Sequence, residues 1–182
     1  GLTFAGSPFS FFQVHKPQAE LLYEKALAYA DLHGGETVID AYCGTGTISL
    51  CLAQKAGRVI GIEIVKEAIE DAKKNATFNH IENAEFYAAD AGEFMPKLYQ
   101  EGLRPDVIVM DPVRAGCSET VLSAAAGMQP SRIVYVSCNV ATFARDAKIL
   151  AGLGYTVKEV TPVDMFPQTM HVETVALLLR KR

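Results

Sequence analysis

The stretch of residues 37–50 constrains the fold of this chain most. Val38 and Ile39 are typical of a short buried strand, and Gly44 and Gly46 after them predict a tight turn into a helix. Glycine adopts backbone conformations that a Cβ atom would block, and a helix directs free N–H groups and the positive end of its dipole at whatever lies over its first turn. Such a strand, turn and helix binds an adenosine-containing cofactor in many α/β proteins. Both glycines are therefore predicted cofactor-binding residues.

The position of Ser49 separates two kinds of cofactor. A dinucleotide-binding turn carries a third glycine where Ser49 stands here, which disfavours a nicotinamide-dependent oxidoreductase. The pattern Asp-x-x-x-Gly-x-Gly-Thr that starts at Asp40 instead resembles the first motif of S-adenosylmethionine-dependent methyltransferases. S-adenosylmethionine has no pyrophosphate, so the glycines would let its methionine part lie close to the backbone. The alternative is an ordinary turn that binds no ligand.

Strand and helix patterns alternate along the rest of the chain. The last two predicted strands have no helix-length segment between them, which indicates antiparallel neighbours. We therefore expect one doubly wound, Rossmann-like α/β domain, mostly parallel with an antiparallel C-terminal strand pair. Besides the turn region, helices are expected at 16–30, 66–79, 93–100, 119–127 and 141–153, and strands at 58–64, 84–89, 106–110, 133–137, 156–162 and 174–179.

Composition narrows the class of protein. The chain has 182 residues, of which 49% are apolar and 21% charged, as in a soluble globular domain. No apolar run would span a membrane and no secretory signal is visible, so we expect a cytoplasmic monomer. The four cysteines lack metal-ligand spacing and are expected to be free thiols. The net charge of −4 predicts weak RNA binding by this chain alone.

Two acids fall at the carboxyl ends of predicted strands, where ligands bind in sheets of this kind. Glu63 lies about 20 residues past the glycines, a distance at which an acid can hold ribose hydroxyls. A solvated charge at a strand end is its alternative. Asp90 could receive the adenine amino group or cap the helix that follows it, and both roles are compatible.

Cys138 is the strongest candidate nucleophile. It ends a predicted buried strand just before a helix N-terminus, a setting that favours a thiolate, although a buried core cysteine is equally consistent with the pattern. Cys117 is a rival, because it also follows a predicted strand. Cys43 lies in the glycine turn and would line the cofactor, whereas Cys51 is expected in the core.

Glu173 is a candidate base. It precedes an apolar strand, with Met165, Phe166 and Met170 nearby, and apolar neighbours would raise the pKa of its carboxyl and suit it to proton transfer. A solvated charge is the alternative for Glu173, and His171 is an alternative base.

Several of these stretches together resemble the RNA uracil-C5 methyltransferase family of the RumA/TrmA type, which makes 5-methyluridine in ribosomal or transfer RNA. They occur in the family's order from one end of the chain to the other. The matching pieces are Ser10-Phe11-Phe12-Gln13-Val14, Asp40-Ala41-Tyr42-Cys43-Gly44-Thr45-Gly46, Asp111-Pro112-Val113-Arg114, Val136-Ser137-Cys138-Asn139 and Asp164-Met165-Phe166-Pro167 leading to His171-Val172-Glu173.

The resemblance implies an enzyme that transfers a methyl group from S-adenosylmethionine to C5 of a uridine in RNA. Cys138 would be the nucleophile that adds to C6 of the uracil, which activates C5, and Glu173 would be the base that removes the C5 proton. The target base would be flipped out of its stack. The residues implied to contact the cofactor are Gln13, Tyr42, Thr47, Glu63, Asp90 and Asp111.

The chain also departs from the family pattern. Val113 replaces a proline and His15 replaces an asparagine, and the resemblance assigns no role to either residue here. Full-length members carry RNA-contacting regions before the catalytic domain, and some carry an iron–sulfur cluster. We expect residues 1–182 to be the catalytic domain alone, with an aromatic segment and a helix in 1–31 packed on it and with the family's N-terminal RNA-binding regions absent.

The sequence leaves three hypotheses about the function. Uracil methylation in 23S rRNA is favoured over the same reaction in tRNA. Methylation of cytosine C5 in RNA also uses a thiolate, but Glu173 favours uracil. A cofactor-binding module without catalysis would need neither Cys138 nor Glu173.

Overall fold

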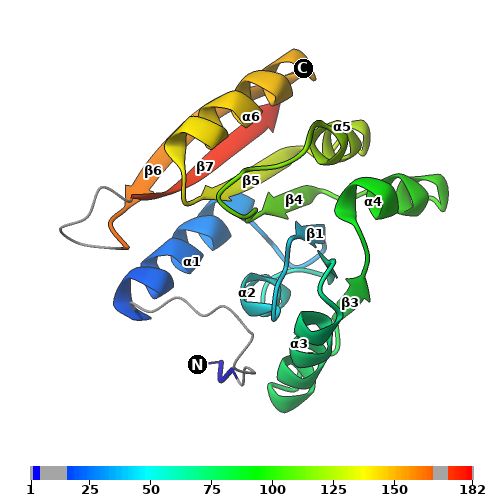
Figure 1. Ribbon diagram of the computed structural model, residues 1–182. Helices are drawn as coiled ribbons and strands as arrows, with labels where there is room; N and C mark the ends of the chain where they lie inside the picture. Colours follow the sequence, from blue (N-terminus) through cyan, green and yellow to red (C-terminus); the bar gives the residue numbers. More distant parts are fainter. Residues whose placement is uncertain (1, 5–15, 166–171, 182) are drawn as a thin grey trace.

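The computed structural model describes residues 2–4, 16–165 and 172–181. Within these ranges strands and helices alternate, as Figure 1 shows. The strands are β1 (Thr37–Ala41), β2 (Arg58–Glu63), β3 (Ala84–Ala88), β4 (Val107–Met110), β5 (Arg132–Ser137), β6 (Tyr155–Val163) and β7 (Glu173–Arg180). The helices are α1 (Lys16–Ala30), α2 (Thr47–Ala53), α3 (Lys66–Phe78), α4 (Ala91–Gln100), α5 (Glu119–Gly127) and α6 (Val140–Gly152).

In the described ranges the strands form one sheet in the order β3-β2-β1-β4-β5-β7-β6. Strands β1 to β5 are parallel, while β7 pairs antiparallel with both β5 and β6. The predicted doubly wound sheet with an antiparallel C-terminal pair is confirmed. The strand order reverses between β1 and β4, which is where ligands bind in open α/β sheets.

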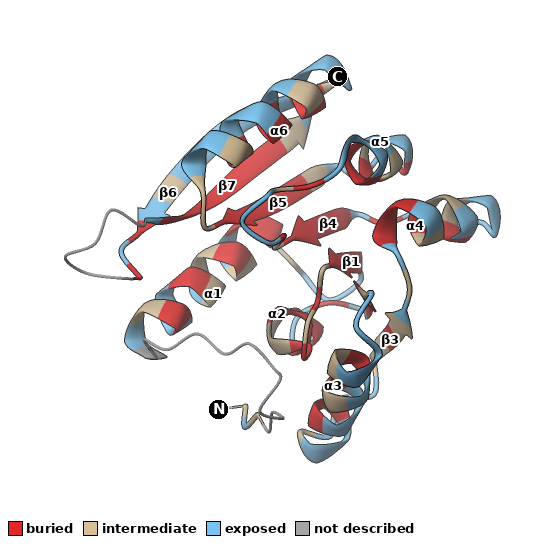
Figure 2. Cartoon of the chain, viewed as in Figure 1, coloured by how far each residue is buried: buried red, intermediate tan, exposed pale blue. Residues whose placement is uncertain are grey.

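Helices cover both faces of the sheet. Alternate strand residues point to opposite faces, so Ile39 packs in the cluster with α4, α5 and α6, whereas Val38 packs in the cluster with α1 and α2. Figure 2 shows β1, β4, β5 and β7 as largely buried and the edge strand β6 as largely exposed. All four residues of β4 are buried, as expected for a parallel strand covered on both faces.

Polar residues fix where three helices begin. Asp90, Ser118 and Asn139 cap α4, α5 and α6, each accepting a hydrogen bond from a backbone N–H of the first turn. The cap at Asp90 explains why α4 begins at Ala91 rather than at the predicted residue 93. The helices predicted at 16–30 and 119–127 are confirmed with the same bounds.

The first described residues dock on the domain. The backbone N–H of Thr3 donates to the Asn79 side chain at 2.9 Å, and Asn79 donates back to the Thr3 carbonyl at 2.7 Å. Leu2 and Phe4 pack against the cluster between α2, α3 and β3. The matching stretch around Gln13, and His171 with residues 166–170, lie outside the described residues.

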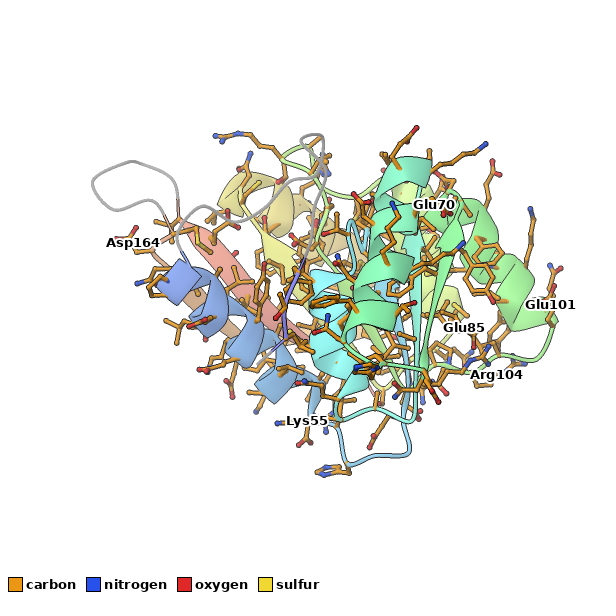
Figure 3. All side chains as sticks on the ribbon, turned by 90° about the horizontal axis from the view of Figure 1, so that it is seen from below. Lys55, Glu70, Glu85, Glu101, Arg104 and Asp164 are labelled. Atoms are coloured by element: carbon orange, nitrogen blue, oxygen red, sulfur yellow. The ribbon has the colours of Figure 1, made fainter. Side chains whose placement is uncertain are left out.

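Charged side chains surround this framework. Those labelled in Figure 3 extend outward at different sides of the domain, with acidic and basic groups interspersed: Lys55, Glu70, Glu85, Glu101, Arg104 and Asp164. Among the described residues, no helix combines the length and the apolar character that crossing a lipid bilayer requires.

Candidate active site

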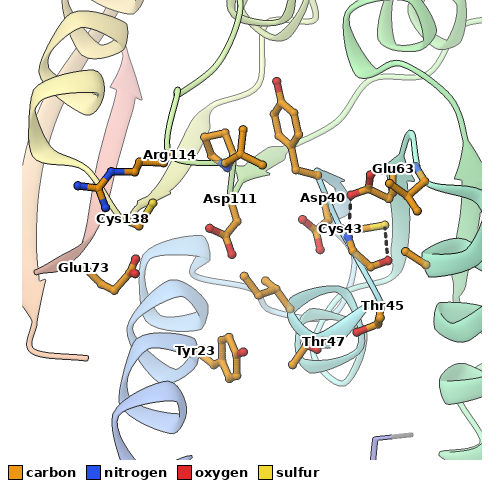
Figure 4. Close-up of a pocket in the computed structure, with 17 residues that line it drawn as sticks. Tyr23, Asp40, Cys43, Thr45, Thr47, Glu63, Asp111, Arg114, Cys138 and Glu173 are labelled. Carbon is orange, nitrogen blue, oxygen red and sulfur yellow. Dashed lines mark hydrogen bonds between the residues drawn. The ribbon is translucent and has the colours of Figure 1, made fainter. Parts of the chain in front are cut away.

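A cavity of about 500 Å³ opens at the carboxyl ends of β1, β2, β4 and β5, where the strand order reverses (Figure 4). It brings together residues from six separate parts of the chain. Predicted site residues that line it are Tyr42, Gly44, Thr47, Glu63, Asp111, Cys138 and Glu173. Further lining residues are Tyr23, Asp40, Cys43, Thr45, Ile48, Val65, Ala68, Pro112, Val113 and Arg114.

The glycine turn forms one wall of the cavity. Tyr42, Gly44 and Gly46 all have positive φ angles, of 70°, 53° and 83°. A Cβ atom on Gly44 would meet nothing within 4 Å, whereas one on Gly46 would lie 3.1 Å from Ala72 and Phe86. Gly44 therefore leaves space at the cavity, while Gly46 is needed for its backbone angle and for packing. Of the two glycines predicted to bind the cofactor, Gly44 lines the cavity and Gly46 supports the turn behind it.

The Glu63 carboxylate is hydrogen-bonded to this turn. One carboxylate oxygen accepts a hydrogen bond from the Gly44 N–H at 3.2 Å, and the other accepts one from the Val65 N–H at 3.0 Å. A solvated strand-end charge is therefore the wrong description of this side chain. The carboxylate holds the turn and the start of the next segment together while it faces the cavity.

Asp40 is a site residue that the sequence analysis did not single out. Its side chain is fully buried in β1, and its Oδ2 accepts a hydrogen bond of 2.5 Å from the Ser49 hydroxyl. Its Oδ1 has no hydrogen-bond partner among the described residues, although the carboxyl lines the cavity. Burial first, and then the nearby Glu63, raise the pKa of Asp40 to about 7, while the Ser49 hydrogen bond opposes the rise. An acid inside an otherwise apolar strand was the available signal, because a buried carboxyl needs partners.

A second acidic group lies across the cavity. Burial first, and then Glu173 and Asp40, raise the pKa of Asp111 to about 8. Glu173 is 5% exposed, and burial raises the pKa of its carboxyl as the sequence analysis predicted. Figure 4 shows Asp111 and Glu173 facing the same space as the Cys138 sulfur and the Arg114 guanidinium. The cavity therefore combines the Cys138 thiol and the Arg114 cation with the carboxyls of Asp111 and Glu173, whose pKa values are both raised.

Cys138 is held in place by its two neighbours. The Ser137 hydroxyl accepts a hydrogen bond from the Asn139 N–H at 3.0 Å and donates one to the Asn139 carbonyl at 2.9 Å. Asn139 in turn accepts a hydrogen bond from the Ala141 N–H at 3.0 Å and caps α6. The predicted position at a strand end before a helix is confirmed.

The expectation that this setting favours the Cys138 thiolate is wrong. Burial raises the pKa of the thiol, and the charges of Glu173 and Asp111 raise it further, while Arg114 opposes them. Burial disfavours the charged form of the thiol, and negative charge disfavours a second anion beside it.

The other cysteines differ from Cys138 in their surroundings. Cys117 is buried outside the cavity lining, and burial raises the pKa of its thiol to about 12. Cys43 lines the cavity, as expected, but Cys51 is only half-buried in α2. All four are free thiols. Cys117 is therefore a poor rival to Cys138 as a nucleophile.

Asp90 and Tyr42, which were predicted to contact the cofactor, differ from the other predicted contacts in where their polar groups lie. Asp90 is exposed outside the cavity lining and accepts a hydrogen bond from the Glu93 N–H at 3.2 Å, so the helix-cap alternative is confirmed. Tyr42 borders the cavity, but its hydroxyl lies beside the Cys117 thiol.

Tyr23 on α1 is a lining residue that the sequence analysis did not predict. Burial and Asp111 raise the pKa of its hydroxyl.

Known RNA methyltransferases are similar to this chain over nearly its whole length. The sequence model of a family described as tRNA (Uracil-5-)-methyltransferase matches residues 9–182. An uncharacterized RNA methyltransferase of Bacillus cereus is 56% identical over 98% of this chain and 39% of its own length. One of Oceanobacillus iheyensis is 58% identical over 99% of this chain and 39% of its own. The chain thus spans about two fifths of the length of these curated relatives.

Solved structures agree with the sequence comparison. The tRNA (uracil-54, C5)-methyltransferase of Pyrococcus abyssi, in complex with S-adenosyl-L-homocysteine, superposes with a TM-score of 0.82 and 36% identity. That match covers 98% of this chain and 42% of the other. The magnesium protoporphyrin IX methyltransferase of Synechocystis with bound SAM has a TM-score of 0.73 at 17% identity, over 98% of this chain and 87% of its own. The latter likeness concerns the fold alone.

Proposed function

The chain belongs to the tRNA (uracil-5-)-methyltransferase family, and on that basis we propose that it transfers a methyl group from S-adenosylmethionine to C5 of a uridine in RNA. One observation carries the proposal. The cavity beside the glycine turn holds Cys138 together with Glu173, a buried acid whose carboxyl has a raised pKa. A cofactor-binding module would need neither group, whereas uracil C5 methylation needs both a nucleophile and a base.

The chain's own residues fit S-adenosylmethionine. Glu63 is fixed by two backbone N–H groups in an orientation suited to ribose hydroxyls. The unpartnered Oδ1 of Asp40 is a buried acceptor for a cationic amino group, and the open space beside Gly44 admits a chain close to the backbone. When bound, the cofactor supplies an electrophilic methyl group. The further proposed contacts are Gln13, Tyr42, Gly46, Thr47, Asp90 and Asp111.

Cys138 and Glu173 have complementary proposed roles. The Cys138 thiolate forms a bond to C6 of the uracil, and the electron pair of the C5–C6 double bond moves to C5, which becomes a carbon nucleophile. Once C5 is methylated, Glu173 removes the C5 proton, the double bond forms again, and the C6–sulfur bond breaks to release the thiolate. A base with a raised pKa is suited to this proton transfer.

RNA recognition is proposed to rest largely on residues outside these 182. The chain carries 17 basic against 21 acidic residues, whereas binding to a phosphate backbone depends on Lys and Arg. The length of the relatives leaves room for such contacts. We therefore propose residues 1–182 as a single catalytic domain, acting in the cytoplasm.

The decisive experiment is covalent trapping on RNA that carries 5-fluorouridine, with the full-length protein and S-adenosylmethionine. Fluorine at C5 cannot leave as a proton, so the enzyme should remain bound through Cys138. Cys138→Ala should abolish the adduct, and the matched control Cys117→Ala should retain it. An adduct that depends on Cys117 instead would refute the assignment, and trapping on 5-fluorocytidine alone would indicate cytosine methylation.

The RNA target needs a separate experiment. We propose 23S rRNA rather than tRNA, and mapping of 5-methyluridine in cells that lack the gene should show loss at a uridine of 23S rRNA with tRNA unchanged. Loss confined to tRNA would reverse this choice without affecting the chemistry.

A further inference from the structure

Asp146 is a fully buried carboxylate that takes no part in the chemistry above and does not line the cavity. Its Oδ2 accepts hydrogen bonds from the Tyr135 hydroxyl at 2.5 Å and from the Cys117 N–H at 2.8 Å. Its Oδ1 accepts one from Nε of Arg145 at 2.8 Å. A buried carboxylate is costly unless every oxygen is paired, so its position needs an explanation.

The partners of Asp146 come from the elements that carry the active site. Tyr135 lies in β5, three residues before Cys138, and Asp146 itself lies in α6, the helix that begins directly after Asn139. Cys117 ends the loop of residues 111–117, which follows β4. One carboxylate therefore ties two of the strand-end segments of the cavity together.

Neighbouring side chains of α6 hold the same loop. The Thr142 hydroxyl donates to the carbonyl of Arg114 at 3.2 Å and to that of Asn139, at the start of α6, at 3.0 Å. Nη2 of Arg145 donates to the carbonyls of Ala115 at 2.9 Å and of Cys117 at 3.2 Å. The loop has no helix or strand of its own between β4 and α5, so side chains of α6 fix its backbone.

The fit between the loop and α6 is close. Gly116 has a φ angle of 78°, and a Cβ atom there would lie 2.6 Å from Oδ2 of Asp146 and 2.7 Å from Nη2 of Arg145. Only glycine combines that backbone angle with so close an approach. The loop therefore has little freedom to move without breaking these hydrogen bonds.

The same loop supplies two groups of the cavity. Asp111 and Arg114 line it, and both affect the pKa of the Cys138 thiol, in opposite directions. The hydroxyl of Tyr42, at the edge of the glycine turn, lies beside the Cys117 thiol at the end of the loop. A shift of the loop would change what surrounds Cys138.

We propose that Asp146 is a positioning residue for methyl transfer, which locks the 111–117 loop against the helix that follows Cys138. This inference rests on the proposed function. Asp146 touches neither substrate nor cofactor. It acts by holding Arg114 and Asp111 in position relative to the Cys138 thiol. Small misplacements of reacting groups cost large factors in rate, so the effect belongs in the chemical step rather than in binding.

The test compares three variants of the full-length protein with a matched control. Asp146→Asn replaces one carboxylate oxygen by an amide N–H, which leaves either Nε of Arg145 or the Cys117 N–H facing another donor. Tyr135→Phe removes one donor, and Thr142→Val removes, at a half-exposed position, the hydroxyl that bonds to the carbonyls of Arg114 and Asn139. The control is Tyr155→Phe. Tyr155 is a buried tyrosine of the same core whose hydroxyl donates to the Pro130 carbonyl at 2.8 Å, outside the cavity lining.

Three quantities are measured: the unfolding midpoint, the affinity for S-adenosylhomocysteine, and the single-turnover rate of methyl transfer at saturating cofactor and RNA. We expect the rate to fall about 10- to 100-fold in Asp146→Asn and Tyr135→Phe, and less in Thr142→Val, with cofactor affinity close to wild type. Tyr155→Phe should lower the midpoint as Tyr135→Phe does but keep the wild-type rate.

Two results would overturn the inference. One is a wild-type rate in Tyr135→Phe and Thr142→Val, whether or not Asp146→Asn folds. The other is an equal loss of rate in Tyr155→Phe, which would indicate a general effect of stability. If the wild-type protein neither methylates RNA nor forms the fluorouridine adduct, the proposed function fails instead.

Discussion

Replacing Asp40 by asparagine should change how stability depends on pH. The folded protein holds the Asp40 carboxyl at a pKa of about 7, mainly because the group is buried. An aspartate in the unfolded chain titrates at about 3.9. The folded state therefore binds this proton more tightly, and the stability that the group contributes is fully present below about pH 4 and lost as pH rises through about 7.

The size of the effect follows from the shift. Each unit of pKa difference corresponds to about 1.4 kcal/mol, so a shift of about three units predicts a loss of about 4 kcal/mol between pH 4 and pH 7. Asparagine keeps the shape and an acceptor for Ser49 but does not titrate. In urea unfolding of the 182-residue chain, the free energy of Asp40→Asn should fall less steeply over this range than that of the wild type.

The comparison has an internal check. Ser49→Ala removes the hydrogen bond that opposes the rise of the Asp40 pKa, so its pH dependence should be steeper than that of the wild type. Asp40→Asn should also bind S-adenosylmethionine about tenfold more weakly, because asparagine cannot ionise when a cationic amino group approaches, whereas Asp40 can. Parallel stability curves for Asp40→Asn and the wild type would refute the view that Asp40 is a buried, largely neutral acid.

Three further outcomes are expected. Glu63→Gln should weaken S-adenosylmethionine binding about tenfold in calorimetry, since an amide replaces a charge-assisted acceptor; unchanged affinity would remove Glu63 from the cofactor site. Gly46→Ala should cost about 3 kcal/mol in urea unfolding and Gly44→Ala about 1, because only the former adds close contacts to the backbone strain; equal losses would contradict this. Glu173→Gln should speed alkylation of Cys138 by iodoacetamide at neutral pH severalfold, as followed by peptide mass spectrometry, because the neighbouring charge that raises the thiol pKa most is gone; a slower reaction would contradict this effect of Glu173.

A comparison of protein lengths tests where RNA is recognised. The 182-residue chain should bind cofactor like the full-length protein but methylate unmodified RNA slower by about 100-fold or more in a tritiated-methyl assay at low salt, because the energy of base flipping must come from contacts elsewhere. Similar turnover of the two would show that these residues hold their own RNA-binding surface.

The sequence by itself determined those helices, strands and turns that depend only on residues close together in the chain. The helix at 16–30 and the strand, turn and helix at 37–50 follow from periodicity and glycine placement, and the short link between the last two strands predicted their antiparallel pairing. Because parallel strands end at one edge, the same reasoning placed Glu63 and Cys138 at one cavity.

Only the tertiary structure decided the burial, the neighbouring charges and the hydrogen-bond partners of those residues. Ser49 looked like a missing glycine, yet it is the hydrogen-bond donor to Asp40, nine residues away. The pKa of Cys138 is raised rather than lowered, because the thiol is partly buried and because Glu173 approaches it from β7. The bond between Asp146 and the Cys117 N–H spans 29 positions. Local pattern fixes each residue's element and direction, but burial, charge and hydrogen bonding depend on partners that only the folded chain brings together.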